Sequence, residues 1–536
     1  MSRYEIKSVW DRDNRNGIND NFMQLFDDVK LVGTLSQSVS DLDTIVKDNS
    51  SKITTLDKLN TRTEELQKDA ERINQMNEDV QVQINNLVLS DGQSDAEVIQ
   101  ARGSFDVLNT RLNNMDDGVD KVKEDIKKLE LYKKVYGSMS KLDLPSDYAS
   151  YSNLDIFTAS NGDVKVHYDV AAKKNPTTKT YYVDVVNGSN NNDGSKENPL
   201  QTVNRALRNG DADTIIVKKG VYGWSNGFGG FDNYQTKSFN LIGEKGVLIG
   251  AHRDNLTWTA DTTHSNVYKT TASSVVEIVD AFNIDNIKFL KKVTSIDLVS
   301  STKGSYYING TDIYVRLHDD RKPDEYVLPN MVNTTANITD LNVYIENVVF
   351  TNTFKHTSTN GTHSLYAKNV DFLVGTNDNA LSVIGSDSIL QNCRAMYASR
   401  DGFNYHHNNG IKNKAIEIDC IGAYNGRDGA DQNNGSTMHD GGTIIRVGGE
   451  YHHNHGPNVI DVNDGGNSYN VGVHAHHSTA VGNVSNVDFR VRDEGGGSEM
   501  YLVNCVSHDS YYSTSVEGQA VLQKENTLLL SDEIKI

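Results

Sequence analysis

The stretch Tyr344-Ile-Glu-Asn347-Val-Val-Phe350 decides the fold, because it returns along the chain as Tyr366-Ala-Lys-Asn369-Val-Asp-Phe372. Further copies follow at Leu390-Gln-Asn392-Cys393-Arg-Ala-Met396 and at Leu502-Val-Asn504-Cys505. The asparagines of the first three copies are separated by 22 and then 23 residues. A period of this length, made of a strand, an asparagine turn and another strand, is typical of a β-solenoid. We therefore expect a mainly β fold, with an asparagine ladder at one bend and valine or cysteine in the interior.

The period lengthens after Cys420, where loops rich in histidine, aspartate and glycine are inserted. Insertions into a solenoid form loops on one face, which is often the binding face. We therefore expect the inserted acidic and imidazole groups to line up along one outer wall.

The three cysteines, Cys393, Cys420 and Cys505, occupy similar places in the repeat, and none belongs to a CxxC pair. This setting argues against a zinc site and against disulfides. We expect small, apolar residues stacked inside the solenoid.

The chain before the repeats has a different character. Residues 1–30 are expected to form a small head, and residues 31–136 a coiled-coil stalk with a break near residues 90–95. After the break, apolar residues recur in steps of 4, 3, 4, 3, 4 and 3, at Leu108, Leu112, Met115, Val119, Val122, Ile126 and Leu129. The alternative is an amphipathic helix on a globular core, but nothing nearby offers such a core. An apolar stripe this narrow needs partner chains, so the stalk predicts a homo-oligomer.

The remaining boundaries follow from changes in composition. We expect a linker over residues 137–179, the solenoid over residues 180–515 and a C-terminal tail over residues 516–536. Within the solenoid region, residues 199–207 predict a short amphipathic helix. Residues 306–315 predict a hairpin with a type I′ turn at Asn309-Gly310.

Charge and hydropathy exclude several classes of function. The formal net charge of -20 argues against nucleic-acid binding and against an anionic membrane surface. No run approaches 18 apolar residues and the N-terminus lacks a signal-peptide core, so we expect no membrane insertion and synthesis in a cytoplasm. A polyanionic substrate would have to be neutralised locally, by a metal or by a few arginines.

The segment from Tyr182-Val-Asp-Val-Val-Asn187 through Asp193-Gly194-Ser to Asn198-Pro199-Leu-Gln-Thr-Val-Asn-Arg-Ala resembles the opening of pectin-lyase-like β-helices. This resemblance covers residues 180–515. It implies a right-handed parallel β-helix whose open end is capped by the short helix.

Residues 1–130 resemble the N-terminal part of tail or baseplate proteins of phages that infect Gram-positive hosts, notably at Ser94-Asp-Ala-Glu-Val-Ile-Gln-Ala-Arg-Gly-Ser-Phe105. A helical stalk followed by a β-helix is similar to trimeric phage tailspikes and tail appendages. That resemblance implies a homotrimeric virion protein, made in the host cytoplasm and attached through its N-terminus to other tail or baseplate proteins. It also implies that the protein binds a host cell-wall glycopolymer.

Nine of the sixteen histidines fall between residues 401 and 477, among aspartates, asparagines and glycines. The stretch from Asp401 to Asp464 resembles the β-helix of appendages that degrade wall teichoic acid. Phosphodiester hydrolysis needs a positioned nucleophile, charge stabilisation at the phosphoryl oxygens and an acid for the leaving group, all of which histidine, aspartate and a metal can supply.

The candidate residues divide by role. The catalytic candidates are His406, His407, Asp428, Asp431, His439, Asp440, His453 and Asp461. The candidates for binding substrate are His455 and Asp464, together with Arg427 and Arg446 as a phosphate clamp. A divalent metal ion of unknown identity would be bound among Asp401, His406, His439, Asp440 and His453.

Other interpretations stay open. Asp428, Asp431, Asp440 and Asp461 could instead serve an exopolysaccharide glycoside hydrolase, which needs two carboxylates, and no feature selects a lyase. Aspartate and asparagine next to glycine are also ordinary turn residues. His452-His453 could be a polar ladder, and residues 474–477 could simply face solvent, in a non-catalytic receptor-binding or structural tail fibre.

Overall fold

The computed structural model of this protein describes residues 139–535, apart from residues 147, 149–153, 160, 230–236, 333–334, 431 and 483–484. The expected head and coiled-coil stalk, residues 1–136, lie outside the described residues. None of the helices in the described part is long and apolar enough to cross a membrane.

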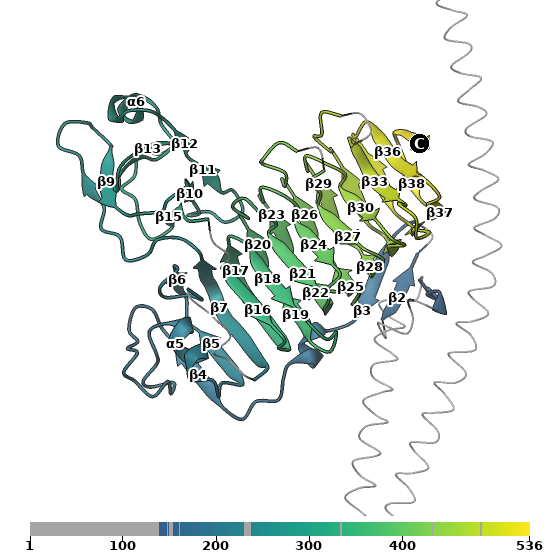
Figure 1. Cartoon of the computed structure of the whole chain (residues 1–536), viewed down its shortest axis with the longest axis horizontal. Helices are drawn as coiled ribbons and strands as arrows, with labels where there is room; N and C mark the ends of the chain where they lie inside the picture. Colours follow the sequence, from purple (N-terminus) through teal and green to yellow (C-terminus); the bar gives the residue numbers. More distant parts are fainter. Residues whose placement is uncertain are drawn as a thin grey trace, which may run out of the picture. The chain divides into compact units, whose positions relative to one another are not determined.

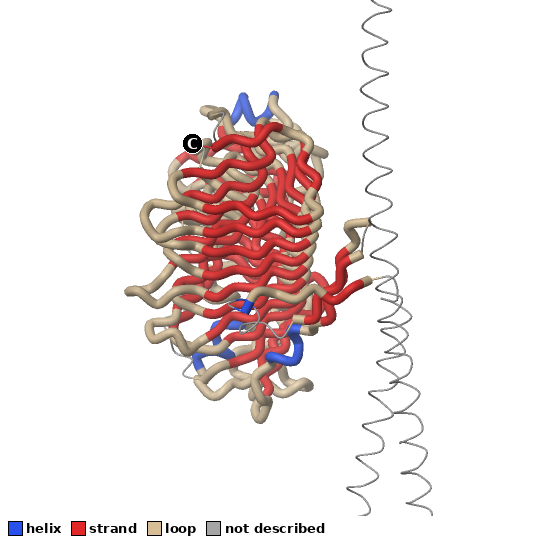
Figure 2. Tube along the Cα trace, turned by 90° about the vertical axis from the view of Figure 1, so that its right-hand side faces the viewer, coloured by secondary structure: helices blue, strands red, loops and turns tan. Residues whose placement is uncertain are grey.

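From Thr180 to Lys535 the chain winds into a parallel β-helix, whose coils stack side by side in chain order (Figures 1 and 2). The expected mainly β fold and parallel β-helix are therefore confirmed. Sheet I contains the first strand of each coil, sheet II the second and sheet III the third.

The strand bounds of the three sheets are as follows. Sheet I contains β4 (Thr180–Val183), β5 (Thr214–Val217), the first parts of β7 (Phe239–Gly250) and β17 (Val343–Thr351), β19 (Ser364–Lys368), β22 (Asp387–Gln391), β25 (Lys414–Ile418), β28 (Thr443–Val447), β31 (Asn467–Val471), β34 (Glu499–Val503) and β37 (Val521–Glu525). Sheet II contains β6 (Gly220–Tyr222), the second parts of β7 and β17, β20 (Asp371–Leu373), β23 (Arg394–Met396), β26 (Ile421–Ala423), β29 (Glu450–His452), β32 (His474–His476), β35 (Val506–His508) and β38 (Leu528–Leu529). Sheet III contains β16 (Ala336–Thr339), β18 (Phe354–Thr357), β21 (Leu381–Ile384), β24 (Phe403–His406), β27 (Ser436–His439), β30 (Val459–Val462), β33 (Val487–Arg492), β36 (Tyr512–Glu517) and β39 (Asp532–Lys535).

The bend between sheets I and II explains the repeated asparagine. Asn347, Asn369 and Asn392 all adopt positive φ there, at 59°, 53° and 52°. Asparagine tolerates this conformation better than most residues. Nδ2 of Asn369 donates to Oδ1 of Asn347 at 3.1 Å, and Nδ2 of Asn392 donates to Oδ1 of Asn369 at 3.3 Å. The predicted asparagine ladder is therefore confirmed.

The interior of the coil is mainly apolar. Inward-facing residues of all three sheets join in one continuous core, which includes the buried Cys393, Cys420 and Cys505. All three cysteines are free thiols, as expected. The short helix α5 (Val203–Arg208) packs Val203, Ala206 and Leu207 into the same core and caps its first coils, confirming the predicted helix.

The segment expected to be a linker has structure of its own. It forms a three-stranded sheet of β1 (Ser140–Lys141), β2 (Asp155–Thr158) and β3 (Val164–His167), in which β2 and β3 are antiparallel, followed by the 3₁₀ helix η1 (Val170–Lys173). Leu154, Ile156 and Val170 pack on outward-facing apolar residues of sheet I, such as Ile416 and Ile445. Burial of these apolar side chains against one another is favourable. The segment therefore covers the outer face of sheet I (Figure 1).

An insertion between β7 and β16 was not expected. It contains β8 (Thr259–Ala260), β9 (Tyr268–Thr271), β10 (Glu277–Asp280), β11 (Lys288–Phe289), β12 (Lys291–Lys292), α6 (Ile296–Ser301), β13 (Ser305–Asn309), β14 (Asp312–Arg316) and β15 (Val327–Asn330), and it has its own core. Its residues Val279, Ile287 and Leu328 pack on outward-facing residues of sheet II as far as Ala423. The insertion therefore covers the first coils of sheet II.

Two details correct the sequence-based expectations. The hairpin of β13 and β14 is present, but Asn309 pairs with Asp312, so its two-residue turn is Gly310-Thr311 rather than Asn309-Gly310. Residues 516–536 are not a tail, because β37, β38 and β39 add to the three sheets. These strands were missed because residues 521–535 do not alternate clearly between apolar and polar side chains, and most of these side chains, Val521, Leu528 and Leu530 included, are exposed.

Candidate functional site

Three of the predicted residues meet at the end of sheet III. His406 is the last residue of β24, His439 is the last residue of β27, and Asp440 follows at a bend with φ of 59°. Parallel pairing of these strands brings the two imidazoles to adjacent coils, where their rings stack with centroids 3.9 Å apart. We call His406, His439 and Asp440 the sheet III cluster.

The contacts in the sheet III cluster orient both imidazoles. Nδ1 of His406 lies 3.0 Å from Oδ2 of Asp440, and the His406 side chain is 42% exposed. A proton on Nδ1 that is held by the carboxylate leaves the lone pair on Nε2 of His406. His407 Nδ1 lies 3.8 Å from the same carboxylate oxygen. The pair has the geometry of an imidazole base that is oriented by a carboxylate.

His439 stays neutral beside this pair. Burial, followed by repulsion from His406, lowers the pKa of His439 to about 3. Nδ2 of Asn404 donates to Nε2 of His439 at 3.3 Å, whereas Nδ1 of His439 is buried and has no hydrogen-bond partner among the described residues. A buried polar nitrogen without a partner costs free energy unless a ligand satisfies it. This atom therefore points to a ligand at the cluster.

Ligand atoms of His406, His439 and Asp440 all lie within 4.8 Å of one another, a spacing that a divalent ion can draw together. Burial works against ionisation of Asp440, but the hydrogen bond and charge of His406, together with His439 and Asn463, outweigh it and lower the pKa of this carboxyl. An ionised carboxylate and a neutral imidazole are the forms that bind a metal. The residues present therefore fit the predicted divalent ion.

Asp401 lies next to the cluster but is buried. Its carboxylate accepts hydrogen bonds from the backbone N–H of Asn434 at 2.7 Å, from Asn404 at 2.5 Å and from Thr437 at 3.0 Å. Burial raises the pKa of Asp401 to about 6 in spite of these bonds. Since all its contacts are internal, Asp401 positions Asn404, and through it His439, rather than binding a metal as expected.

Two further residues reach the turn after Asp440. Asp464, a predicted substrate-binding residue, is exposed in the corresponding turn of the next coil, where its backbone carbonyl faces Gly441. The ammonium group of Lys412 also approaches Gly441. Lys412 was not predicted, although the run His406-His407-Asn-Asn-Gly-Ile-Lys412 places it in the loop that follows the two histidines.

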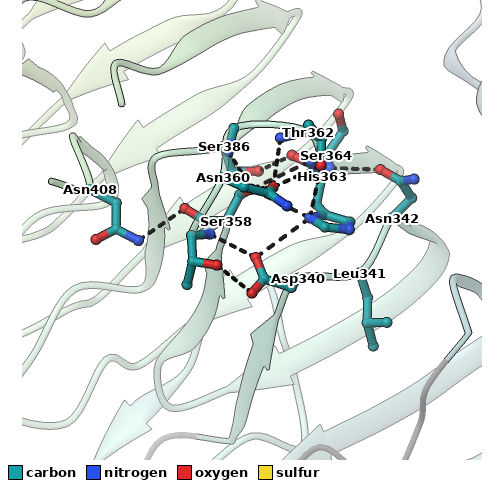
Figure 3. Close-up of polar contacts among 12 residues, drawn as sticks. Asp340, Leu341, Asn342, Ser358, Asn360, Thr362, His363, Ser364, Ser386 and Asn408 are labelled. Atoms are coloured by element: carbon teal, nitrogen blue, oxygen red, sulfur yellow. Dashed lines mark hydrogen bonds and ion pairs between the residues drawn. The ribbon is translucent and has the colours of Figure 1, made fainter. Parts of the chain in front are cut away.

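The same corner of the helix is polar in the preceding coils (Figure 3). Asp340 accepts hydrogen bonds from the backbone N–H and the hydroxyl of Thr359, at 2.7 and 2.6 Å, and lies 3.5 Å from Nδ1 of His363. Nδ2 of Asn408 donates to the carbonyl of Ser358 at 2.9 Å. Because Asn408 directly follows His407, this network adjoins the sheet III cluster.

Arg446 and Asp461 lie inside the helix, which corrects their predicted roles. Both side chains are fully buried, with Nη1 of Arg446 3.5 Å from Oδ1 of Asp461 and Nε 4.0 Å from Oε2 of Glu417. Alternation along β28 points Ile444 and Arg446 inward, and sequence alone could not tell the inward face from the outward one. An arginine sealed in the core cannot clamp a phosphate.

The polar interior continues around these charges. The hydroxyls of Tyr405 and Ser436 donate to Glu417 at 2.7 and 2.8 Å, and Tyr451 also donates to it. Burial raises the pKa of Asp461, and burial followed by the charge of Glu417 raises that of Tyr405. This cluster was missed because Glu417 stands alone in an apolar strand, where it has the pattern of a surface residue.

Arg427 is also committed to a structural role. Its guanidinium contacts Oε2 of Glu277 at 3.1 Å and lies 4.0 Å over the ring of Phe289, both in the insertion. These contacts hold the insertion against the coil. To bind a phosphate, the guanidinium would have to give up its ion pair and its contact with the ring, which costs free energy. The predicted clamp of Arg427 and Arg446 is therefore wrong.

The remaining candidates lie in other places. Asp428 caps a turn by accepting from the backbone N–H of Ala430 at 2.9 Å and from Asn433, and Asp431 lies outside the described residues. His455 donates its backbone N–H to Asn425 in the loop between sheets II and III. His453 belongs to a second group of histidines on sheet II, where its ring stacks on that of His477 with centroids 4.9 Å apart. The expectation of one outer wall is therefore wrong, because the groups divide between two sheets and the interior.

A cavity of about 480 Å³ lies elsewhere, between the first coils and the insertion. Its lining includes Asn226, His252, Asp254 and Trp258. Both ring nitrogens of His252 lack partners among the described residues, and burial lowers the pKa of His252 to about 3. This cavity contains none of the predicted residues.

Comparisons with known proteins give only distant structural likenesses. No protein-family model and no curated protein matches this sequence. Among solved structures, the chain is similar to XylC in complex with xylose, with 10% identity, a TM-score of 0.34 and coverage of 65% of this chain and 68% of that one. The pectate lyase Pel9A has 11% identity and a TM-score of 0.32, with coverage of 65% of this chain and 70% of that one. The tailspike protein gp49 of Pseudomonas phage LKA1 has 10% identity and a TM-score of 0.16, with coverage of 59% of this chain and 66% of that one. Likenesses this distant say nothing about activity.

Proposed function

We propose that this protein is a phage tail spike that binds a host cell-surface glycopolymer and hydrolyses it at the sheet III cluster. The favoured substrate is wall teichoic acid, and the favoured reaction is hydrolysis of its phosphodiester bonds. The observation that carries the proposal is the half-exposed His406, held by Asp440 through its Nδ1 and stacked on a neutral His439 that has an unsatisfied nitrogen.

The chemistry follows from these contacts. Nε2 of His406 accepts a proton from water as the water attacks phosphorus, and Asp440 stabilises the imidazolium that forms. The same proton can then be transferred to the leaving alkoxide. A divalent ion held by Asp440 and His439, with Nε2 of His406 left free as the base, would supply Lewis-acid stabilisation of the phosphoryl oxygens. Lys412 supplies positive charge at the same turn, where Arg427 and Arg446 do not.

Phosphodiester hydrolysis is favoured over glycoside hydrolysis because of the carboxylates. A glycosidase needs two carboxyl groups facing one sugar. Of the described carboxylates proposed for that role, Asp461 is inside the helix and Asp428 caps a turn, which leaves Asp440 alone at the cluster. An imidazole and a carboxylate are the better set for phosphoryl transfer to water.

The rest of the proposal concerns assembly. We propose that residues 1–30 anchor the protein in the virion and that residues 31–136 form a trimeric stalk. The grounds are the heptad seam and the resemblance to tail and baseplate proteins. Other tail or baseplate proteins would then bind the N-terminus, and the host cell-wall glycopolymer would meet the β-helix.

The test is a product assay on the full-length protein. Purified wall teichoic acid is incubated with the wild type and with Asp440→Asn, with and without a chelator, and new phosphomonoester ends are measured. The proposal expects phosphomonoesters from the wild type and a large loss in the variant. Loss with chelator would show that the activity needs a divalent ion. Reducing ends without phosphomonoesters would indicate a glycoside hydrolase, and unsaturated ends a lyase. Polymer binding without any product would leave a receptor-binding fibre.

A further inference from the structure

The second group of histidines lies on the coils of sheet II that directly follow those covered by the insertion. Outward-facing positions of sheet II carry Leu373, Met396 and Ala423 in the coils that the insertion covers. In the next coils, the positions in register with Ala423 carry His452 and His476. Any polar side chain would suit a solvent-exposed position, so exposure alone does not explain why several of these positions are histidine. The choice of residue points to a function of its own.

This group, the sheet II array, spans three successive coils. It consists of Glu450, His452 and His453 from the first coil, His474, His476 and His477 from the second, and His508 from the third. His452 pairs in register with His476, and His476 with His508. Their rings stack with centroids 5.0 and 4.8 Å apart.

Nitrogen atoms in the sheet II array face one another rather than carbonyl or hydroxyl groups. Nε2 of His474 lies 2.7 Å from Nε2 of His508, and Nδ1 of His476 lies 2.8 Å from Nδ1 of His477. Each such contact needs one proton shared between two lone pairs. Nδ1 of His508 also lies 2.7 Å from Oδ2 of Asp509, so the carboxylate holds its proton there and leaves the lone pair on Nε2.

The carboxylate of Glu450 completes the set. Its Oε1 lies 2.7 Å from Nε2 of His476. Ligand atoms of Glu450, His474 and His476 all lie within 4.8 Å of one another, and so do those of His476, His477 and His508. Side-chain rotations would be enough to bring these donors to 2.0–2.2 Å from one bound ion.

Burial and neighbouring charges both act on the ionisable groups of the array. Burial, then repulsion from His476 and His508, lowers the pKa of His474. Burial works against ionisation of Glu450, but the hydrogen bond from His476 and the charges of His452, His476 and His474 together outweigh it and lower the pKa of this carboxyl.

We propose that Glu450, His474 and His476, with His508 beside them, bind a divalent transition-metal ion of the zinc type on the outer face of sheet II. Imidazole nitrogens with one carboxylate oxygen are the donor set that Zn²⁺ prefers over Mg²⁺ or Ca²⁺. Because the ligands come from successive coils, the ion ties β29, β32 and β35 together. This site is separate from the sheet III cluster and does not depend on the proposed hydrolysis.

The test is metal binding by the full-length protein after treatment with a chelator and dialysis. Zn²⁺ alone is titrated by calorimetry, and Co²⁺ alone by visible absorption, which reports tetrahedral nitrogen and oxygen ligation. His476→Ala removes the residue shared by both ligand groups and is expected to weaken the site by about 100-fold or more. The wild type, but not the variant, is expected to unfold at a higher temperature with Zn²⁺.

Two controls separate the possible sites. His439→Ala disables the sheet III cluster and is expected to bind the equivalent of Zn²⁺ that His476→Ala loses. His264→Ala, in the insertion, is expected to bind Zn²⁺ as the wild type does. If His476→Ala does not fold, as judged by circular dichroism, His474→Gln and Glu450→Gln replace it. The proposal is overturned if the wild type binds no Zn²⁺, or if the sheet II variants bind it as tightly as the wild type. It is also overturned if the only bound equivalent is lost in His439→Ala.

Discussion

Arg446 is fully buried, and its partners Glu417 and Asp461 are also sealed in the helix. Removing one member of a buried ionic cluster leaves the others uncompensated in a medium that solvates them poorly. We expect Arg446→Met to lower the free energy of unfolding by about 3–5 kcal/mol, measured by denaturant titration.

The matched control for this loss is Arg492→Met. Arg492 is 40% exposed and pairs with Glu494 and Glu517 at the surface. Exposed ion pairs of this kind contribute about 0–1 kcal/mol. Equal, small losses in both variants would show that the interior cluster does not contribute in the way described.

His406 and Asp440 should affect turnover without a comparable effect on folding, because both lie at the surface end of sheet III. If His406 is the base and Asp440 orients it, His406→Gln and Asp440→Asn should each lower phosphomonoester release roughly 10²–10⁴-fold. Unfolding temperature is measured in parallel. Asp461→Asn, inside the helix, should instead lower stability. Full turnover in both surface variants would rule out this site.

At the scale of the element, the bend between sheets I and II is the most readable feature of the chain. Asn369 adopts φ of 53° and hydrogen-bonds both neighbouring asparagines. Asn369→Ala should cost about 1–2 kcal/mol from the left-handed conformation, together with the lost ladder bonds. Asn369→Gly should cost less, because glycine adopts this conformation freely.

The control for the asparagine bend is Asn337→Ala, an exposed position in β16. It should change the midpoint of urea unfolding little. A loss for Asn369→Gly as large as that for Asn369→Ala would mean that backbone conformation is not what the corner asparagine provides.

The sequence predicted those parts of the fold that repeat. The period placed the asparagine bend and the three cysteines correctly, because the same backbone conformation recurs at Asn347, Asn369 and Asn392. It did not predict the insertion that covers sheet II, which does not repeat the pattern. It also missed the strands after residue 516, although Asn526 continues the asparagine ladder with φ of 45° and a hydrogen bond to Asn504. These segments are placed by packing between parts of the chain that are distant in sequence, and a local sequence pattern does not predict such packing.

The site was predicted in part for the same physical reason. His406, His439 and Asp440 were singled out by composition, and strand pairing brings them together. Arg446 and Asp461 were singled out equally, but a strand alternates between two faces, and a polar residue can lie on either. Most of the histidines lie in strands or directly after them, rather than in inserted loops, so their grouping is set by the register of the coils.

For the whole molecule, buried neutral histidines predict sensitivity to acid. The pKa values of His252 and His439 are lowered to about 3, and those of His356 and His452 to about 4, with burial as the first cause in each. In the unfolded chain the usual value is about 6.5. The unfolded state therefore binds more protons between these values, and the stability that these groups contribute above about pH 6.5 is lost as the pH falls.

Two buried carboxyls act in the opposite direction. Burial raises the pKa of Asp401 and Asp488 to about 6, from an unfolded value of about 3.9. Their contribution is present at low pH and is lost as the pH rises through about 6. Since the four histidines are shifted further, we expect a lower unfolding temperature at pH 5 than at pH 7.5, measured by calorimetry. His252→Gln should reduce this difference, and a difference of opposite sign would contradict the account.

The central claim is that the polymer meets the β-helix at the end of sheet III. The most direct measurement is a structure of the full-length protein with a short teichoic-acid oligomer, determined with Asp440→Asn to slow cleavage. The account predicts a phosphate group within hydrogen-bond distance of His406 or His439, with its charge facing Lys412. An oligomer seated instead in the cavity lined by Trp258, or on the sheet II array, would contradict it.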